Sequence, residues 1–391
     1  MSWKKKFVRN WGRLGMKFNR YALSDLATIK YGKNQKKVLS ESGNIPIYGT
    51  GGLMGYATTA LYDKPSVLIG RKGTIGKVKY VEHPFWTVDT LFYTIINTDI
   101  VLPKYLYYVM SLIDLNNYNE GTTIPSLRTE TLNRLEFDIP SLVEQETILS
   151  CLNPIDEKIA LNNAINNNLE QQAQAIYRSW FVNYEPFDGT KPDDWSDGTI
   201  DDLGTEIICG KTPSTKKSEY YGGNTPFITI PDMHGCVYIV STERYLSDAG
   251  VASQPKKTLP PNTVCVSCIG TAGLVTLVSE ESQSNQQINS IIPKEGISVY
   301  YIYLLMQTLA DTINKLGQSG STIVNLNKTQ FGKIQVMIPS ELVLQDFDSL
   351  CRPLFDTILS NQKENINLSE LRDALLPKLM SGELDVSDID L

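Results

Sequence analysis

The sequence has little of the side-chain chemistry that catalytic sites need. It holds only two histidines, His83 and His234, and neither has a cysteine or carboxylate nearby at the spacing of metal ligands. No Walker-type phosphate loop occurs, because the glycine-rich stretch 70–77 (GRKGTIGK) lacks the closing Gly-Lys-Ser or Gly-Lys-Thr. The pair Cys265 and Cys268 lies in a predicted strand with no second pair, which favours a structural role over zinc binding. These absences argue against a self-sufficient nuclease or methyltransferase.

Long apolar runs are missing as well. No stretch of about 18 apolar residues occurs, so no segment is predicted to span a membrane. The first 20 residues carry seven Lys or Arg and no acid, and they lack the apolar core of a signal peptide. Met16 offers an alternative start, so residues 1–15 are expected to be an extension. Because the six cysteines show no dense framework, we expect a cytoplasmic location.

A repeat of about 200 residues organises the sequence. Residues 121–127 (GTTIPSL) correspond to 320–326 (GSTIVNL) with a shift of 199, and residues 73–76 (GTIG) correspond to 270–273 (GTAG) with a shift of 197. This period is too long for a solenoid, whose units run roughly 20 to 50 residues. The repeat therefore predicts two similar domains, each followed by a similar connector.

The net charge of −7 is unevenly distributed. Residues 1–140 have a net charge of +8 and residues 198–340 of −1, whereas 141–197 and 341–391 each have −7. The acid therefore lies in the connectors and the tail, and the average charge hides a basic first domain.

Each domain combines short helices with short strands. Strand signals are runs of β-branched and aromatic residues between Gly and Pro, and residues 135–139 alternate with a period of two. The expected strands are 45–48, 66–69, 135–139 and 263–266, and the expected helices are 23–26, 102–114, 200–203 and 299–316.

The connectors show the heptad pattern of a coiled-coil seam, with steps alternating between four and three. The seam of the first connector is Ile148, Leu152, Ile155, Ile159, Asn162, Asn166, Leu169, Ala173, Ile176 and Trp180. The seam of the second is Phe347, Cys351, Leu354, Ile358, Asn361, Asn365, Leu368, Leu375 and Leu379, and Arg372 interrupts it. We expect Pro154 and Pro353 to start or kink the helices and Pro377 to end the second one.

Asparagine recurs at both equivalent seam positions, which argues against two solvent-exposed helices that carry Asn by chance. If the helices pack antiparallel, Asn162 should lie near Asn365 and Asn166 near Asn361, where paired amides would fix the register. The predicted fold class is thus α+β: two mixed α/β domains separated by two long antiparallel helices that form a coiled coil, with a pseudo-twofold internal repeat. The expected boundaries are 1–142 for the first domain, 143–182 for the first helix, 183–340 for the linker and second domain, and 341–391 for the second helix and acidic tail.

The repeated loops suit contact with a DNA groove, since Arg pairs with guanine and Asn or Gln with adenine. For any single residue a solvated surface role fits as well, so the loops as groups carry the prediction. The candidates in the first domain are Tyr48, Thr50, Tyr56, Arg71, Lys72, Lys77, Thr122, Thr123, Ser126 and Arg128. The candidates in the second domain are Lys216, Lys217, Tyr220, Tyr221, Gln286, Gln287, Asn289, Ser321, Asn325, Asn327 and Lys328.

Four features of the chain resemble the specificity subunit of Type I restriction–modification systems. Residues 176–187 (IYRSWFVNYEPF) are similar to that family's central conserved region, and residues 376–384 (LPKLMSGEL) to its C-terminal ending. The others are the Ile-Pro-Ser of 139–141 leading to Glu144-Gln145, and the domain–helix–domain–helix order over nearly the whole chain. The basic residues 1–15 and the acidic tail after Leu384 depart from the family's pattern.

The resemblance implies that each domain is a target recognition domain reading one half of a split, asymmetric DNA site. It also implies that the helices set the gap and dock two modification subunits, which bind S-adenosylmethionine and carry the methyltransferase chemistry. Two restriction subunits would add cleavage and translocation driven by ATP and Mg. This chain would then be non-catalytic, with no cofactor of its own.

Two other functions stay open. One is a non-catalytic coiled-coil adaptor, against which the basic first domain argues. The other is the recognition subunit of a methylation-only or related defence system. The sequence leaves open the DNA site, the spacer length and the residues that contact bases.

Overall fold

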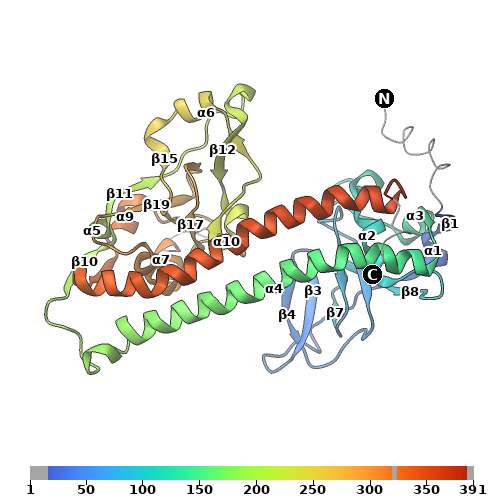
Figure 1. Cartoon of the computed structure of the whole chain (residues 1–391), viewed down its shortest axis with the longest axis horizontal. Helices are drawn as coiled ribbons and strands as arrows, with labels where there is room; N and C mark the ends of the chain where they lie inside the picture. Colours follow the sequence, from blue (N-terminus) through green and yellow to red (C-terminus); the bar gives the residue numbers. More distant parts are fainter. Residues whose placement is uncertain (1–15, 319–323, 385–391) are drawn as a thin grey trace. The chain divides into compact units, whose positions relative to one another are not determined.

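The computed structural model describes residues 16–318 and 324–384, which form two compact units. The first unit takes in the chain up to Glu157 and again from Leu368, and the second comprises Lys158–Asn367. Each unit therefore contains a part of both long helices, α4 (Leu142–Phe181) and α10 (Glu341–Met380) (Figure 1). The candidate Ser321, the expected extension 1–15 and the tail beyond Leu384 lie outside the described residues.

The first unit contains a four-stranded sheet of order β2-β8-β5-β6, a three-stranded sheet of order β4-β3-β7 and the pair β1-β9. Its strands are β1 (Asn19–Ala22), β2 (Ala27–Tyr31), β3 (Ile45–Gly49), β4 (Gly52–Ala57), β5 (Ser66–Gly70), β6 (Val78–Val81), β7 (Trp86–Thr87), β8 (Leu91–Ile96) and β9 (Glu136–Ile139). Its shorter helices are α1 (Leu23–Leu26), α2 (Pro103–Ser111), η2 (Leu115–Tyr118) and α3 (Thr129–Asn133).

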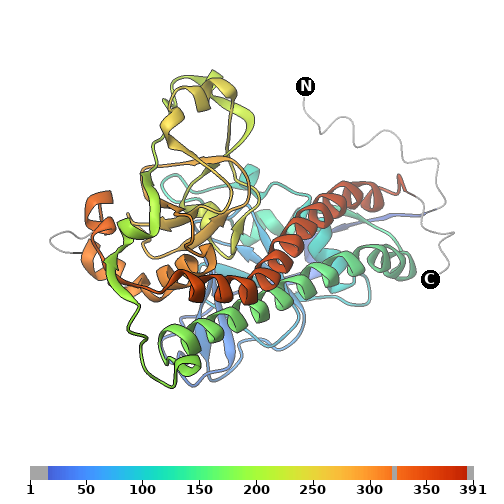
Figure 2. The ribbon, with the colours of Figure 1, turned by 60° about the vertical axis from the view of Figure 1, so that its left-hand side comes forward.

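The second unit contains a five-stranded sheet of order β11-β19-β16-β17-β13, a four-stranded sheet of order β14-β12-β18-β15 and the pair β10-β20. Its strands are β10 (Ser196–Thr199), β11 (Gly204–Cys209), β12 (Tyr221–Ile228), β13 (Tyr238–Ile239), β14 (Tyr245–Leu246), β15 (Thr258–Leu259), β16 (Val264–Ser267), β17 (Val275–Val278), β18 (Ser282–Ser284), β19 (Ile288–Pro293) and β20 (Gln335–Ile338). Its shorter helices are η3 (Glu185–Phe187), α5 (Ile200–Leu203), η4 (Ser218–Tyr220), η5 (Ile230–Met233), α6 (Asp248–Ala252), η6 (Pro255–Lys257), α7 (Val299–Thr308), α8 (Ala310–Gly317) and α9 (Lys328–Gly332). In both views β12, β15 and α6 lie on the side of this unit away from α4 (Figures 1 and 2).

The two units share one topology, which confirms the predicted repeat. The strand order β2-β8-β5-β6 corresponds to β11-β19-β16-β17, and the pair β1-β9 corresponds to β10-β20. In each unit one parallel pairing joins the second sheet: β3 with β7, and β12 with β18. The same chain path is therefore built twice from different sequences.

Two predictions about helix ends were wrong, those for residues 299–316 and for Pro377. Residues 299–316 form two helices, because the chain turns at Leu309, whose ψ is 0° and whose amide bonds back to both Leu305 and Met306. Of the two roles predicted for Pro154 and Pro353, starting the long helices is excluded, since α4 and α10 each begin twelve residues earlier and continue through these prolines. A capping box starts α4 instead: the Glu144 amide donates to Ser141 Oγ, and the Ser141 amide donates to the Glu144 carboxylate at 2.8 Å.

Pro377 also fails to end α10, which runs on to Met380. A proline removes only its own amide donor, and the Pro377 carbonyl still accepts from the Ser381 amide at 3.0 Å. The chain then leaves the helix at Gly382, whose φ of +71° is left-handed.

In the second unit α4 and α10 pack antiparallel through the predicted asparagine pairs. Asn162 Nδ2 donates to Asn365 Oδ1 at 2.9 Å, and Asn361 Nδ2 donates to Asn166 Oδ1 at 2.9 Å. Asn162 is fully buried and also donates to Glu364, although its own Oδ1 has no hydrogen-bond partner. The paired residue on α10 moves back along the sequence as the residue on α4 moves forward, so the two helices run antiparallel and the prediction is confirmed.

Replacing all four seam asparagines by Leu should hold or raise the free energy of unfolding, because buried polar groups contribute specificity more than stability. The single register should at the same time be lost, since leucines pack in several alignments. Urea unfolding measures the first effect, and spin-label distances between α4 and α10 measure the second. One sharp distance in the quadruple variant would contradict a register role for these amides.

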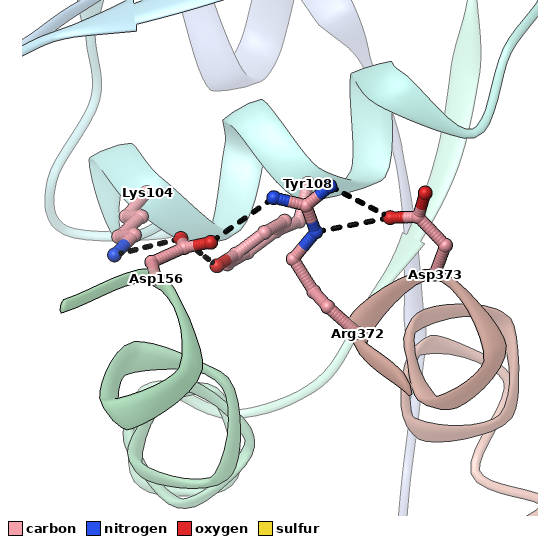
Figure 3. A network of polar contacts seen from close by, with 5 residues as sticks. All are labelled: Lys104, Tyr108, Asp156, Arg372 and Asp373. Carbon is pink, nitrogen blue, oxygen red and sulfur yellow. Dashed lines mark hydrogen bonds and ion pairs between the residues drawn. The ribbon is translucent and has the colours of Figure 1, made fainter. Parts of the chain in front are cut away.

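In the first unit a polar network joins α2 to both long helices (Figure 3). The Asp156 carboxylate on α4 accepts from the Tyr108 hydroxyl and pairs with Lys104 at 3.1 Å and with Arg372 of α10 at 3.2 Å. Arg372 also pairs with its neighbour Asp373 at 2.9 Å. The arginine that interrupts the apolar seam thus completes an ion network at this end of α10.

The network sets the charge state of Asp156. Burial by itself raises the pKa of this carboxyl, but the hydrogen bond from Tyr108 and the cations Lys104 and Arg372 outweigh burial and lower the pKa. A lowered pKa means that the network stabilises the fold above the ordinary carboxyl pKa, and that this contribution disappears as the pH falls through the folded-state pKa.

Asp156→Asn should therefore destabilise the protein by about 1–3 kcal/mol at pH 7, because two half-buried cations lose their shared partner. The difference from wild type should shrink as the pH falls below about 4, because the carboxyl of the unfolded chain takes up a proton there and that of the folded protein follows at lower pH. Asp373→Asn is the matched control, since that side chain is 65% exposed and should contribute little. Equal unfolding midpoints for the two variants at pH 7 would contradict this assignment.

Candidate nucleic-acid interface

The two repeated loops of the first domain lie side by side. The Gly73 amide donates to the Pro125 carbonyl at 2.9 Å, and the Leu127 amide donates to the Arg71 carbonyl at 2.9 Å. Lys72 and Ser126 form an isolated β-bridge between these two bonds. Segments 50 residues apart in sequence therefore make one surface, which we call the first loop pair (residues 70–77 and 120–128).

The second domain builds the same arrangement. The Gly270 amide donates to the Val324 carbonyl at 3.0 Å, and the Leu326 amide donates to the Cys268 carbonyl at 3.0 Å. Gly73 and Gly270 both have left-handed backbones, with φ of +87° and +77°, a conformation that other residues adopt at a cost. The described parts of residues 268–275 and 318–328 form the second loop pair.

Several candidates of the first domain are available on the surface. Lys72, Lys77, Thr122 and Thr123 are exposed in the first loop pair, and Tyr56 is 45% exposed on β4. Thr50 is half-buried next to this surface, because its Oγ1 lies 3.8 Å from where a Cβ on Gly73 would be.

Two cations of the first loop pair already have partners. Arg71 donates to the Asp89 carbonyl at 2.8 Å and lies over the Tyr31 ring at 5.0 Å. Arg128 pairs with Glu120 at 3.1 Å, although its side chain stays 69% exposed. Both guanidiniums are thus held in place at the surface, where a bidentate contact profits from a fixed orientation.

The structure corrects the prediction for Tyr48. Its side chain is buried in a small core with Phe85, its hydroxyl lies 3.3 Å from His83 Nε2, and Lys79 Nζ lies 3.8 Å from its ring centroid. Burial, together with nearby Tyr56, raises the pKa of Tyr48, and burial lowers the pKa of Lys79. Tyr48 therefore supports β3 from inside and is not placed to contact a base.

In the second domain Lys216, Lys328 and Asn325 are exposed, as is Gln286, whose Oε1 accepts from Thr212 at 2.8 Å. Lys217 donates to the Tyr220 hydroxyl at 3.0 Å, and this hydrogen bond raises the pKa of the lysine.

Other candidates of the second domain hold the backbone. Tyr221 donates to the Pro213 carbonyl, Gln287 donates to the Ile269 carbonyl, and Asn327 caps α9 by accepting from the Gln330 amide. Asn289 is buried and donates to the Leu326 carbonyl at 3.4 Å, so the prediction that it contacts DNA is corrected to a structural role in the second loop pair.

The structure adds Lys36 and Lys37 to the candidates that the sequence prediction named. The Lys33 amide donates to the Thr87 carbonyl and the Lys211 amide donates to the Ser284 carbonyl, each at 2.8 Å, so the two Gly-Lys turns are equivalent. A Lys-Lys pair follows each turn, 36–37 in the first domain and 216–217 in the second, and all four side chains are exposed. The Gly-Lys dipeptide that recurs at 32–33 and 210–211 was the signal that could have shown this equivalence. Its two copies are 178 residues apart, whereas the repeated loops are 197 to 199 residues apart.

Cys265 and Cys268 are both buried in the second domain, and burial raises the pKa of each thiol to about 12. They stay protonated at neutral pH, and Cys265 Sγ lies 3.3 Å from Ser290 Oγ. Among residues 16–318 and 324–384 no three His, Cys, Asp or Glu gather as metal ligands would. No helix in the described part of the chain is long and apolar enough to cross a membrane.

The architecture of two pseudo-equivalent domains, joined by paired helices and each bearing an equivalent loop pair, defines a protein with two related candidate binding surfaces. A sequence model of the Type I restriction modification DNA specificity domain matches residues 16–171 and 192–345. Because these two matches cover most of the chain, the protein belongs to the family of Type I restriction–modification DNA specificity proteins.

Similar proteins agree with this assignment. The chain is 33% identical to the Type I restriction enzyme HindI specificity subunit of Haemophilus influenzae, over 79% of this chain and 84% of that protein. It is 26% identical to the Type I restriction enzyme MjaIX specificity subunit of Methanocaldococcus jannaschii, over 84% of this chain and 80% of that one. The crystal structure of the Type I restriction–modification S subunit from M. genitalium has the same fold, with a TM-score of 0.56 and 17% identity over 93% of this chain and 96% of that chain.

The two Lys-Lys pairs should contribute equally to the salt dependence of duplex DNA binding. Changing either pair to Ser should lower the slope of log affinity against log salt by about 1 to 2, because each phosphate contact releases roughly 0.9 counterion. Fluorescence anisotropy at several salt concentrations measures this slope. Lys294→Ser is the control, since Lys294 is exposed near Glu341 at the start of α10 and away from the loop pairs. An unchanged slope in both Lys-Lys variants would remove these lysines from the interface.

Proposed function

We propose that the chain is the DNA-recognition subunit of a Type I restriction–modification complex, in which each domain contacts one half of a split, asymmetric site. The single observation that supports this most is the duplicated loop pair, with Gly73 and Gly270 holding equivalent backbone turns. Glycine at these turns allows close approach of the backbone, and the neighbouring cations complement phosphates. Asymmetry of the site follows from the side chains, because Arg71 and Lys72 of the first loop pair correspond to Cys268 and Ile269 of the second.

The long helices serve, in this proposal, as the ruler between the two half-sites. Their seam is pinned by the hydrogen bonds Asn162–Asn365 and Asn166–Asn361, which one alignment of the helices satisfies. Half-site centres should be about one turn of DNA apart, roughly 34–36 Å, so that both domains meet one face of the duplex.

Two modification subunits would dock on the helices and supply the methyltransferase chemistry with S-adenosylmethionine. The acidic charge of segments 141–197 and 341–391 suits a protein partner better than phosphate. Apolar side chains are also exposed on the helices, among them Leu161, Ile165 and Leu350 at 55%, 37% and 48%. Two restriction subunits, with ATP and Mg, would complete the assembly.

Methylome sequencing of cells that express the chain with its modification subunit tests the proposal. Methylation should fall on two unlike half-sites separated by a fixed spacer, and the purified chain alone should transfer no methyl group to DNA. A continuous palindrome, or methyl transfer by the chain after removal of every partner, would contradict the proposed function.

A further inference from the structure

The β3–β4 hairpin of the first domain exposes an unusual amount of apolar surface. Leu53 and Met54 at its tip are 53% and 54% exposed, and Tyr56 on the same strand is 45% exposed. Leu39, which lies against Gly55, is 54% exposed. We call Leu53, Met54 and Tyr56 the apolar tip. Four exposed large apolar side chains on this hairpin and on the segment beside it mark, on a folded protein, a contact surface.

The apolar tip is not an unfinished part of the core. The base of the hairpin is closed by Ile47, Ala57 and Val88, which are all buried. Beyond this base Gly51 and Gly52 have no atom within 4 Å of where their side chains would begin. The tip therefore projects from the domain on the edge strand β4.

The apolar tip is continuous with the proposed DNA surface. Thr50, just before it, adjoins Gly73 of the first loop pair. On its other edge the Ser40 amide donates to the Tyr56 carbonyl at 3.0 Å and the Thr58 amide donates to the Val38 carbonyl at 3.0 Å, which places the strand beside the segment that follows Lys36 and Lys37. Residues 30–37 carry four lysines and no acid, so cations flank the apolar side chains.

The second domain has no such hairpin at the corresponding place. Its strand β12 pairs with β18 as β3 pairs with β7, and the short strand β14 pairs with β12 where β4 pairs with β3. The turn η5 and strand β13 separate β12 from β14 along the chain, so the two do not form a tight hairpin. In η5 Thr229 and Asp232 form a capping box and Met233 is buried. In the described part of residues 196–340 the single large apolar side chain that is well exposed is Leu316 on α8. The apolar tip is thus a feature of one domain alone.

We propose that the apolar tip is a DNA wedge: Leu53 and Met54 enter a groove of the first half-site and insert between adjacent base pairs. The inference rests on the proposed function and adds a deformation step to it. Flexible apolar side chains such as Leu and Met are the groups that proteins insert at base steps, and nearby cations hold the phosphates on either side. Because the second domain lacks the hairpin, the wedge enters the first half-site alone.

The test uses the full chain with its modification subunit and a duplex that carries the methylated site. 2-Aminopurine is placed at successive positions of each half-site, since its fluorescence rises when stacking is lost. Apart from the target bases that the modification subunits extrude, wild type should brighten the probe at one step of the first half-site and at none of the second. Leu53→Ser with Met54→Ser should abolish that signal and weaken binding roughly tenfold, as expected when two half-exposed apolar side chains lose a buried contact.

Leu112→Ser, a change at an apolar residue after α2 that is 43% exposed, is the control and should leave both signal and affinity unchanged. An absence of brightening at every position with tightly bound wild type would overturn the wedge while leaving the proposed function intact. Unchanged DNA affinity with lost binding of the modification subunit would also overturn it, since the tip would then be a protein contact. Failure of wild type to bind the site would contradict the proposed function itself.

Discussion

The antiparallel packing of α4 and α10 is the constraint on which both domains depend. The core of the first unit contains Ile148 and Leu152 from α4 together with Leu376 and Leu379 from α10. The core of the second unit contains Ala173 and Tyr177 from α4 together with Phe347 and Cys351 from α10. Neither core is complete without both helices, so the helices are structural parts of the domains as well as connectors between them.

Different interactions lie at equivalent positions near the two ends of the helix pair. In the first unit Asp156 joins Lys104, Tyr108 and Arg372 in a polar network. The equivalent of Asp156 under the shift of 199 is Phe355, which stacks on Tyr300 with ring centroids 4.5 Å apart. Ion pairs weaken with acid and are screened by salt where they reach the surface, whereas aromatic packing responds to neither. The repeat therefore preserves the joint, and the Asp156 network makes its first end sensitive to pH.

Divergence between the two loop pairs follows the same logic. The glycine turns and the Gly-Lys turns keep their backbone hydrogen bonds in both domains, while the side chains around them change. A scaffold fixed by main-chain bonds tolerates this, because the groups that hold the loops are not the groups that read the ligand. The apolar tip goes further, since one domain carries a tight hairpin where the other has two strands separated along the chain by η5 and β13.

The structural features that were predicted best from the sequence are those that appear in it as a period or a repeat. The seam, its asparagine pairs and the equivalence of residues 73 and 270 are all visible as spacing, and the structure has each of them. Burial depends on residues far away along the chain, and the sequence pattern does not record it. Tyr48 is covered by Phe85 and Lys79, and Asn289 donates to the Leu326 carbonyl, so the prediction that both contact DNA was wrong. Lys36 and Lys37 were missed because the two domains have loops of different length between the Lys-Lys pair and the glycine turn. Equivalent residues are 197 positions apart at the glycine turns but 180 apart at the Lys-Lys pairs, so the shift of the repeat does not align the lysines.

The central claim is that the paired helices fix the distance between two DNA half-sites. Inserting four residues, about one helical turn, after Asn167 tests it, because this lengthens α4 alone beside the asparagine pairs. Methylome sequencing of cells with the altered chain and its modification subunit should show both half-sites unchanged in sequence, with the spacer shifted or methylation lost. The same site with the same spacer would show that the helices are not the ruler.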